Sequence, residues 1–203
     1  MTTAIEMHRF TTRGRLFFRW TQRLLFIAGA LAVSYVALTL LHARLYQEAA
    51  DSSLEKQIFA QEQHKVSLST VVAKQGDVLG RIVIPRLGMK VAILEGTSAH
   101  ILGLGIGHIE GTALPGEPGN AGIAGHRDTY FRGLKNIRAN DEIQIQTATG
   151  LSRYLVDWVR IVAPNNTGIL APSGGSALTL ITCYPFHFLG AAPQRFVVHA
   201  RKE

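Results

Sequence analysis

An uninterrupted apolar stretch near the N-terminus limits the fold of this chain more than any other feature. Residues 24–43, LLFIAGALAVSYVALTLLHA, contain no Asp, Glu, Lys or Arg. A helix of this length rises about 30 Å, the thickness of the hydrocarbon core of a bilayer. We therefore predict a transmembrane signal-anchor helix over 24–43. The alternative is a cleaved signal peptide, but the stretch is long for one and no convincing small-residue cleavage site follows it.

The charges around this stretch predict its orientation. Five arginines and one glutamate lie within residues 1–23, which therefore carry more than half of the net charge of +7. By the positive-inside rule this basic tail stays in the cytoplasm and the rest of the chain is exported. We expect a single-pass protein of the cell membrane, held in the lipid bilayer by residues 24–43, with an extracytoplasmic domain. The remaining basic excess is modest, so no nucleic-acid partner is predicted.

The chain after the span divides into two parts. Residues 44–70 are polar and contain no Gly or Pro, which predicts a helical stalk or linker. Short β segments fill residues 71–203. No long helices alternate with them, which argues against a doubly wound α/β sheet. The expected fold is mainly β, a mostly antiparallel barrel or sandwich of seven or eight strands with short helices.

Apolar runs and alternating patterns locate the expected strands. They are 81–85, 91–94, 142–146, 154–162, 178–182 and 195–200, with short helices after residue 98 and around 131–135. The glycine-rich stretch 96–125 contains neither GxGxxG nor the phosphate-loop pattern, so nucleotide binding is rejected. Its glycines are assigned to tight turns and to close backbone packing behind His126.

Cys183 is the only cysteine of the chain, so it has no partner for an internal disulfide. Exported proteins commonly pair their cysteines, and a single unpaired one is either incidental or needed as a thiol. The apolar run 177–181 is predicted to bring this thiol to a strand end, which is a rigid support for an exposed nucleophile. A buried packing role and an intermolecular cross-link are the alternatives.

Two other residue types complete a possible reaction centre. A histidine can accept the thiol proton and later protonate a leaving amine, and an arginine can hydrogen-bond the developing oxyanion. His126, in the run AGHRD, and Arg195, twelve residues after the cysteine, are the candidates. Together with Cys183 they suffice for acyl transfer from a peptide bond if the fold brings them together.

The motifs around these residues resemble those of the sortases, exported cysteine transpeptidases, and are most similar to class D and related groups. The likeness covers nearly all of residues 71–203, and the cysteine run with its later arginine is its most specific part. In chain order the matching segments are GRIVIP at 80–85, EGT at 95–97, GH at 107–108, GTALPG at 111–116, GN at 119–120, IAGHRD at 123–128, FR at 131–132, TLITC at 179–183 and RFVV at 195–198.

The resemblance implies a sortase-type eight-stranded β-barrel in which Cys183 is the nucleophile, His126 the catalytic histidine and Arg195 the oxyanion-stabilising arginine. It implies substrate proteins with an LPxTG-like C-terminal sorting signal, cleaved after threonine through a thioacyl-enzyme. An amine of a peptidoglycan precursor or a protein lysine then accepts the acyl group, which anchors the substrate at the cell surface. An exported cysteine peptidase that mainly hydrolyses the same signal remains open, and so does a membrane-tethered β module without catalysis.

Three further residues are candidates for substrate binding. Thr182 is expected to line the groove through its backbone or hydroxyl group. His108 recurs in the family's GxGH pattern, with a structural hydrogen bond to the glycine-rich loop as the alternative. Asp128 either orients His126 or caps the following turn.

No cofactor and no metal are predicted. Within the family that the chain resembles, class A sortases are helped by calcium through an acidic loop pocket. In this chain acidic residues are sparse, and Asp141 and Glu142 are the only adjacent acidic pair. A zinc hydrolase is disfavoured because neither HExxH nor CxxC occurs. In the same family, class C sortases carry a lid with an Asp-Pro-aromatic motif. This sequence has no Asp-Pro, which argues against a lid-type pilin polymerase.

Overall fold

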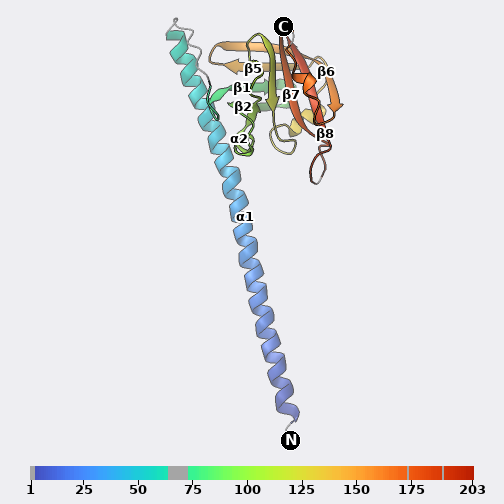
Figure 1. The fold of residues 1–203 in the computed structure, drawn as a ribbon. Helices are drawn as coiled ribbons and strands as arrows, with labels where there is room; N and C mark the ends of the chain where they lie inside the picture. Colours follow the sequence, from blue (N-terminus) through green and yellow to red (C-terminus); the bar gives the residue numbers. More distant parts are fainter. Residues whose placement is uncertain (1–2, 64–72, 173, 189) are drawn as a thin grey trace. The chain divides into compact units, whose positions relative to one another are not determined.

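The computed structural model describes residues 3–63, 73–172, 174–188 and 190–203, in two units, Met1–Arg44 and Leu45–Glu203. The long helix α1 (Thr3–Gln63) begins in the first unit (Figure 1). Its segment Arg19–Ala50 is long and apolar enough for a membrane anchor or a signal sequence. The predicted stalk is helical as far as Gln63, and residues 64–70 lie outside the described ones.

The second unit is built on a closed barrel of eight strands with the order β1-β2-β3-β4-β7-β8-β6-β5. The pairs β2–β3 and β4–β7 are parallel and the other neighbours are antiparallel. This confirms the predicted barrel with short helices. The strands are β1 (Val78–Ile84), β2 (Met89–Glu95), β3 (Ile106–His108), β4 (Gly119–Ala124), β5 (Glu142–Thr147), β6 (Gly150–Val162), β7 (Ser176–Tyr184) and β8 (Gln194–Lys202).

Short helical turns connect the strands, as expected. The helix α2 (Ala99–Leu104) begins after Ser98, whose hydroxyl accepts a hydrogen bond from the N–H of Ile101, a residue type and geometry typical of an N-cap. The 3₁₀ turn η2 (Arg132–Asn136) follows the loop that carries His126. The others are η1 (Pro85–Leu87) and η3 (Thr167–Leu170).

The strands expected from the sequence did not include two segments of the glycine-rich stretch 96–125, which form β3 and β4. The sequence of β4, GNAGIA, lacks the β-branched and aromatic pattern of a strand, since Ile123 is its only β-branched residue. Its place between β3 and β7 explains the small residues. A Cβ on Gly122 would lie 2.7 Å from the Leu170 side chain, so a strand of larger residues could not pack under the loop that follows β6.

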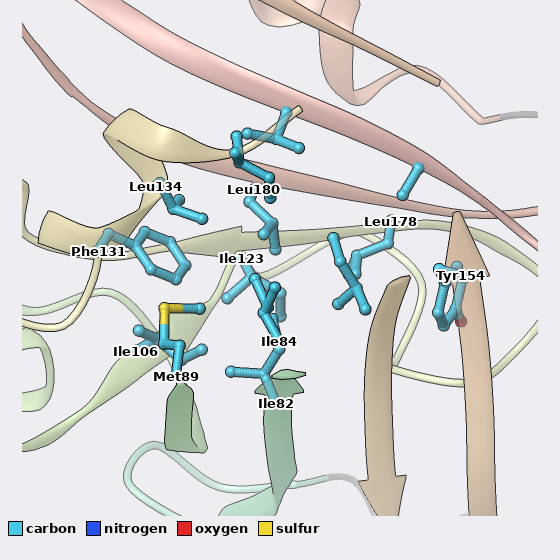
Figure 2. Packing of buried hydrophobic residues seen from close by; sticks show 14 of the residues in the cluster. Ile82, Ile84, Met89, Ile106, Ile123, Phe131, Leu134, Tyr154, Leu178 and Leu180 are labelled. Atoms are coloured by element: carbon cyan, nitrogen blue, oxygen red, sulfur yellow. The ribbon is translucent and has the colours of Figure 1, made fainter. Parts of the chain in front are cut away.

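The barrel interior is filled by aliphatic and aromatic side chains from every strand (Figure 2). Each such residue contributes roughly 1.5–3 kcal/mol on burial. Phe131, from the loop after β4, is fully buried in the same cluster and ties that loop to the core. Members with no exposed surface include Ile82, Ile84, Ile106, Ile123, Leu134, Ile143, Ile145, Leu178 and Leu180.

The acidic pair noted in the sequence has a structural contact that couples stability to pH. Asp141 is buried and accepts hydrogen bonds from the guanidinium of Arg86 and from the backbone N–H of Arg138. The hydrogen bond from Arg86 is the main cause that holds the pKa of Asp141 below its usual value. A lowered folded-state pKa stabilises the fold above the unfolded value of about 3.9, and this is lost as pH falls through the folded pKa.

We expect Asp141→Asn to lower the melting temperature at pH 7 by a few degrees, because the charge-assisted contacts with Arg86 disappear. Below about pH 4 the difference from the parent chain should shrink, since the carboxylate of the unfolded parent chain is then protonated and the folded one follows at lower pH. Thermal unfolding followed by circular dichroism from pH 2 to 7 measures both effects. A constant difference across that range would contradict the assignment. The neighbouring Glu142→Gln serves as the control.

Candidate active site

The candidate nucleophile lies at the C-terminal end of β7. Cys183 is half-buried, and its Cα partner across the antiparallel β7–β8 pair is Arg195. Residues directly opposite one another in such a pair project to the same face of the sheet, with their Cβ atoms about 4.5–5.5 Å apart. The thiol and the stem of the arginine therefore leave the sheet on the same side.

The guanidinium of Arg195 is held by two backbone carbonyls that precede it in the chain. Its Nη1 donates hydrogen bonds to the carbonyls of Gln194, at 3.1 Å, and of Ala192, at 3.3 Å. The side chain is half-buried, so part of the guanidinium stays accessible. A planar group with five N–H donors can keep these contacts and still donate to an oxyanion.

The parallel β4–β7 pair brings the candidate histidine to the same end of the barrel. Ala124 is the Cα partner of Ile181, and the N–H of Gly125 donates to the carbonyl of Ile181 at 3.1 Å. His126 is the second residue after Ala124, as Cys183 is the second after Ile181. The exposed His126 thus lies at the strand ends that also carry the cysteine and its arginine partner.

The loop that carries His126 is fixed on both sides. The backbone carbonyl of His126 accepts a hydrogen bond from the N–H of Phe131 at 3.1 Å, and the ring of Phe131 is buried in the core. Before it, the carbonyl of Gly125 accepts a hydrogen bond of 2.7 Å from the hydroxyl of Thr182. The backbone on which the imidazole depends is therefore held by the core and by β7.

Arg127 connects this loop to the segment that follows the cysteine, a contact that the sequence analysis missed. Its guanidinium donates to the carbonyls of Pro185 at 3.0 Å, Phe188 at 2.7 Å and Gly190 at 3.3 Å. It also lies 5.9 Å from the centre of the Phe188 ring. Its position next to His126 in the sequence was the signal that could have indicated this role. Its partners could not be predicted, because they lie about sixty residues away in the chain.

Two of the three predicted substrate-binding residues are buried. Thr182 is 2% exposed, and its hydroxyl is used in the bond to Gly125. His108 is also 2% exposed. Its Nδ1 lies 2.8 Å from a carboxylate oxygen of Glu95, and its Nε2 lies 2.9 Å from the carbonyl of Ala113. This is the structural hydrogen bonding to the glycine-rich loop considered above, and contact of either residue with substrate stays a prediction.

The third of these residues, Asp128, is exposed in the turn after His126. A role in orienting the imidazole also stays a prediction. Among the residues that the structure describes, no group of three or more His, Cys, Asp or Glu side chains is arranged to hold a metal ion.

A buried amide anchors the loop between β6 and β7, which we predict to shape the substrate groove. Asn120 on β4 donates from Nδ2 to the carbonyls of Ile169, at 3.1 Å, and Ala171, at 3.2 Å. Its Oδ1 accepts a hydrogen bond of 2.8 Å from the hydroxyl of Thr179 on β7. The sequence offered only an asparagine beside glycines, which is typical of turns, so this role was not predicted.

We expect Asn120→Ala to raise the KM for a peptide with an LPxTG-like sorting signal severalfold and to destabilise the fold by about 1–3 kcal/mol, because the fully buried Thr179 and two backbone carbonyls lose their hydrogen bonds. The turnover rate should change less than the KM, since none of these hydrogen bonds involves Cys183, His126 or Arg195. Peptide titration at a temperature well below the melting point measures both. Asn165→Ala, at an exposed position of the same loop, is the matched control. An unchanged KM would contradict the role of this loop.

The chain is similar to known proteins in both sequence and fold. A model of the sortase domain family matches residues 82–203. Sortase D of Bacillus subtilis is 32% identical over 128 residues, which cover 63% of this chain and 65% of that protein. Sortase A of Bacillus anthracis is 26% identical over 110 residues, covering 52% of each. The matched regions span less than two thirds of either relative.

Solved structures extend the likeness to the three-dimensional fold. The Sortase D5 transpeptidase of Clostridium perfringens has a TM-score of 0.64 and 27% identity, covering 79% of this chain and 97% of that one. Sortase A of Corynebacterium diphtheriae has a TM-score of 0.59 and 26% identity, covering 79% and 84%. With the family model matching more than half of its length, the chain belongs to the sortase family.

Proposed function

We propose that this chain is a membrane-anchored sortase that cleaves an LPxTG-like C-terminal sorting signal after threonine and transfers the acyl group to an amine. The observation that carries the proposal is the strand register at one barrel end. Cys183 lies opposite Arg195 across β7–β8. His126 follows the last residue of β4 by two positions, and Cys183 follows the partner of that residue on β7 by two positions. A cysteine, a base and an oxyanion donor are the groups that such a reaction needs.

In the proposed reaction the thiolate of Cys183 attacks the carbonyl carbon of the substrate threonine and forms a C–S bond. Arg195 donates hydrogen bonds to the oxyanion of the tetrahedral intermediate. The C–N bond then breaks, and His126 gives its proton to the leaving amine. An incoming amine next attacks the thioester, transfers its proton to His126 and displaces the thiolate, which restores the enzyme.

The proposed location is the cell membrane, with one span, a cytoplasmic N-terminus and an extracytoplasmic barrel. The apolar helix and the arginines that precede it support this orientation. Substrate proteins would then reach the enzyme outside the cytoplasm. The proposed acceptor is an amine of a peptidoglycan precursor or a protein lysine, both of which belong to the cell surface.

The test uses the full-length chain in detergent, mixed with LPxTG-like peptides in the presence and absence of triglycine or diaminopimelate, and followed by intact mass. We expect an acyl adduct on Cys183, absent in Cys183→Ala, and an amine-ligated peptide. An adduct that resolves only to hydrolysed peptide with every amine would favour the cysteine peptidase. No adduct with any peptide, from a folded chain whose thiol can be alkylated, would contradict the proposal.

A further inference from the structure

The part of α1 that follows the predicted span is packed into the second unit. Tyr46 contacts a small apolar cluster formed by Leu94, Ile101 and Leu104, and Ala50 is only 5% exposed. These contacts belong to a folded domain. A stalk that only spaced the barrel from the bilayer would not need them.

Gln47, in this segment, uses both ends of its amide group in contacts with the barrel. Its Oε1 accepts a hydrogen bond of 2.9 Å from the N–H of Ala92 on β2, and its Nε2 donates to the carbonyl of Leu104. An amide can accept and donate at the same time, so one side chain joins two elements. These partners lie in β2 and at the end of α2.

The chain makes room for this amide. The pairing of β2 with β3 begins at Ile93 and Ile106, so the N–H of Ala92 lies just outside that ladder. It donates to the Oε1 of Gln47 instead of to a strand carbonyl. A Cβ on Gly105 would lie 3.1 Å from the Gln47 Nε2 and 2.9 Å from the carbonyl of Ala92. A larger residue at position 105 would therefore crowd the amide.

The helix α2 and Tyr130 link Gln47 to the histidine loop. The hydroxyl of Tyr130, a half-buried residue, donates to the carbonyl of Gly103 at 3.2 Å, next to the carbonyl of Leu104 that Gln47 binds. Burial raises the pKa of Tyr130, and its interaction with the Gln47 amide opposes that shift. The next residue, Phe131, donates its N–H to the carbonyl of His126. Gln47 and Tyr130 thus bind neighbouring carbonyls of α2, and Tyr130 belongs to the loop that carries the proposed general acid and base.

We propose that Gln47 is a positioning residue, which holds the His126 loop in its reactive geometry through the end of α2 and Tyr130. The helix immediately after the span would then belong to the catalytic unit. This inference rests on the proposed function of His126. A small displacement of a positioned catalytic group lowers the rate far more than it lowers stability, which separates this role from a purely structural one.

The experiment uses the full-length chain in phospholipid nanodiscs and four variants. Gln47→Met keeps the shape of the side chain without its hydrogen bonds, Tyr130→Phe removes only the hydroxyl, and the double variant combines both. Glu48→Ala, at an exposed position of the same helix, is the matched control. The measurements are the single-turnover rate of acylation by an LPxTG-like peptide, alkylation of Cys183 by iodoacetamide, the melting temperature, and hydrogen exchange of the amides in 125–131.

We expect Gln47→Met and Tyr130→Phe each to slow acylation about tenfold at a temperature well below melting. The double variant should be no slower than either single one, because both break the same link. Alkylation should be unchanged, amides in 125–131 should exchange faster, and Glu48→Ala should match the parent chain.

Three results would overturn the inference: parental acylation rates in both single variants, losses that multiply in the double variant, or alkylation that falls in parallel with acylation. If the parent chain itself forms no adduct, the proposed function fails, and hydrogen exchange alone then decides whether Gln47 restrains the loop. Unchanged exchange in Gln47→Met would reject that restraint.

Discussion

Replacing His126 with glutamine is expected to slow formation of the thioacyl-enzyme by about 10²–10⁴-fold, the usual contribution of a general acid and base. Glutamine keeps the polarity of the side chain and can form hydrogen bonds, but it cannot exchange a proton near neutral pH. Without a proton donor the amine of the cleaved signal is a poor leaving group. Single-turnover acylation followed by intact mass measures the loss directly.

Two controls separate this chemistry from a change in fold. The thiol of Cys183 should still react with iodoacetamide in His126→Gln, because alkylation needs no leaving-group proton. His187→Gln alters another exposed histidine, four residues after the cysteine, and should acylate like the parent chain. Acylation by His126→Gln at the parental rate would reject the proposed role and point to a different proton donor.

Gly125→Ala is expected to reduce acylation by about 10²-fold, although it adds only a methyl group next to the histidine. The new Cβ would lie 2.7 Å from Cδ2 and 2.9 Å from Cγ of Phe131, and 3.0 Å from the Ile106 side chain. The ring of Phe131 is fully buried, so it cannot rotate away into solvent. The loop must shift instead, and it carries His126 with it.

The same substitution should destabilise the fold by about 1–3 kcal/mol, as overpacking in a filled core does. Gly133→Ala is the matched control, because a Cβ at that position meets no atom within 4 Å and the backbone there has no positive φ. Acylation rates and thermal unfolding of the two variants, compared at one temperature below both melting points, provide the measurement. Equal activity of Gly125→Ala and the parent chain would show that Phe131 does not restrain the histidine.

Strands with a clear apolar pattern could be predicted from the sequence, and those without one could not. In β5 the alternation of Ile143 and Ile145 with polar residues was sufficient. In β4 both faces are buried, and most of the residues are glycine and alanine, whose preference for strands is low. The segment is extended because it pairs with its neighbouring strands. The parallel β4–β7 pair also escaped prediction, because it joins segments that are 57 positions apart.

The candidate catalytic residues were predictable from residue type and motif, whereas their supports were not. Cys183 is the only thiol, and the histidine and arginine were chosen for the chemistry they could add to it. Arg127, Asn120 and Gln47 act through backbone carbonyls and N–H groups that lie 45 to 63 positions away. Such partners depend on strand register and loop path, and no local pattern encodes them.

The parallel pairing of β4 with β7 fixes the spacing between His126 and Cys183, because each follows a residue of that pairing by two positions. Residues 127–175 connect the two strands but take no part in their pairing. The loop at 163–175 can therefore vary in length without altering the spacing between His126 and Cys183. Transplanting that loop from another sortase, with the Asn120 contacts preserved, offers a route to new signal preferences on an unchanged reaction centre.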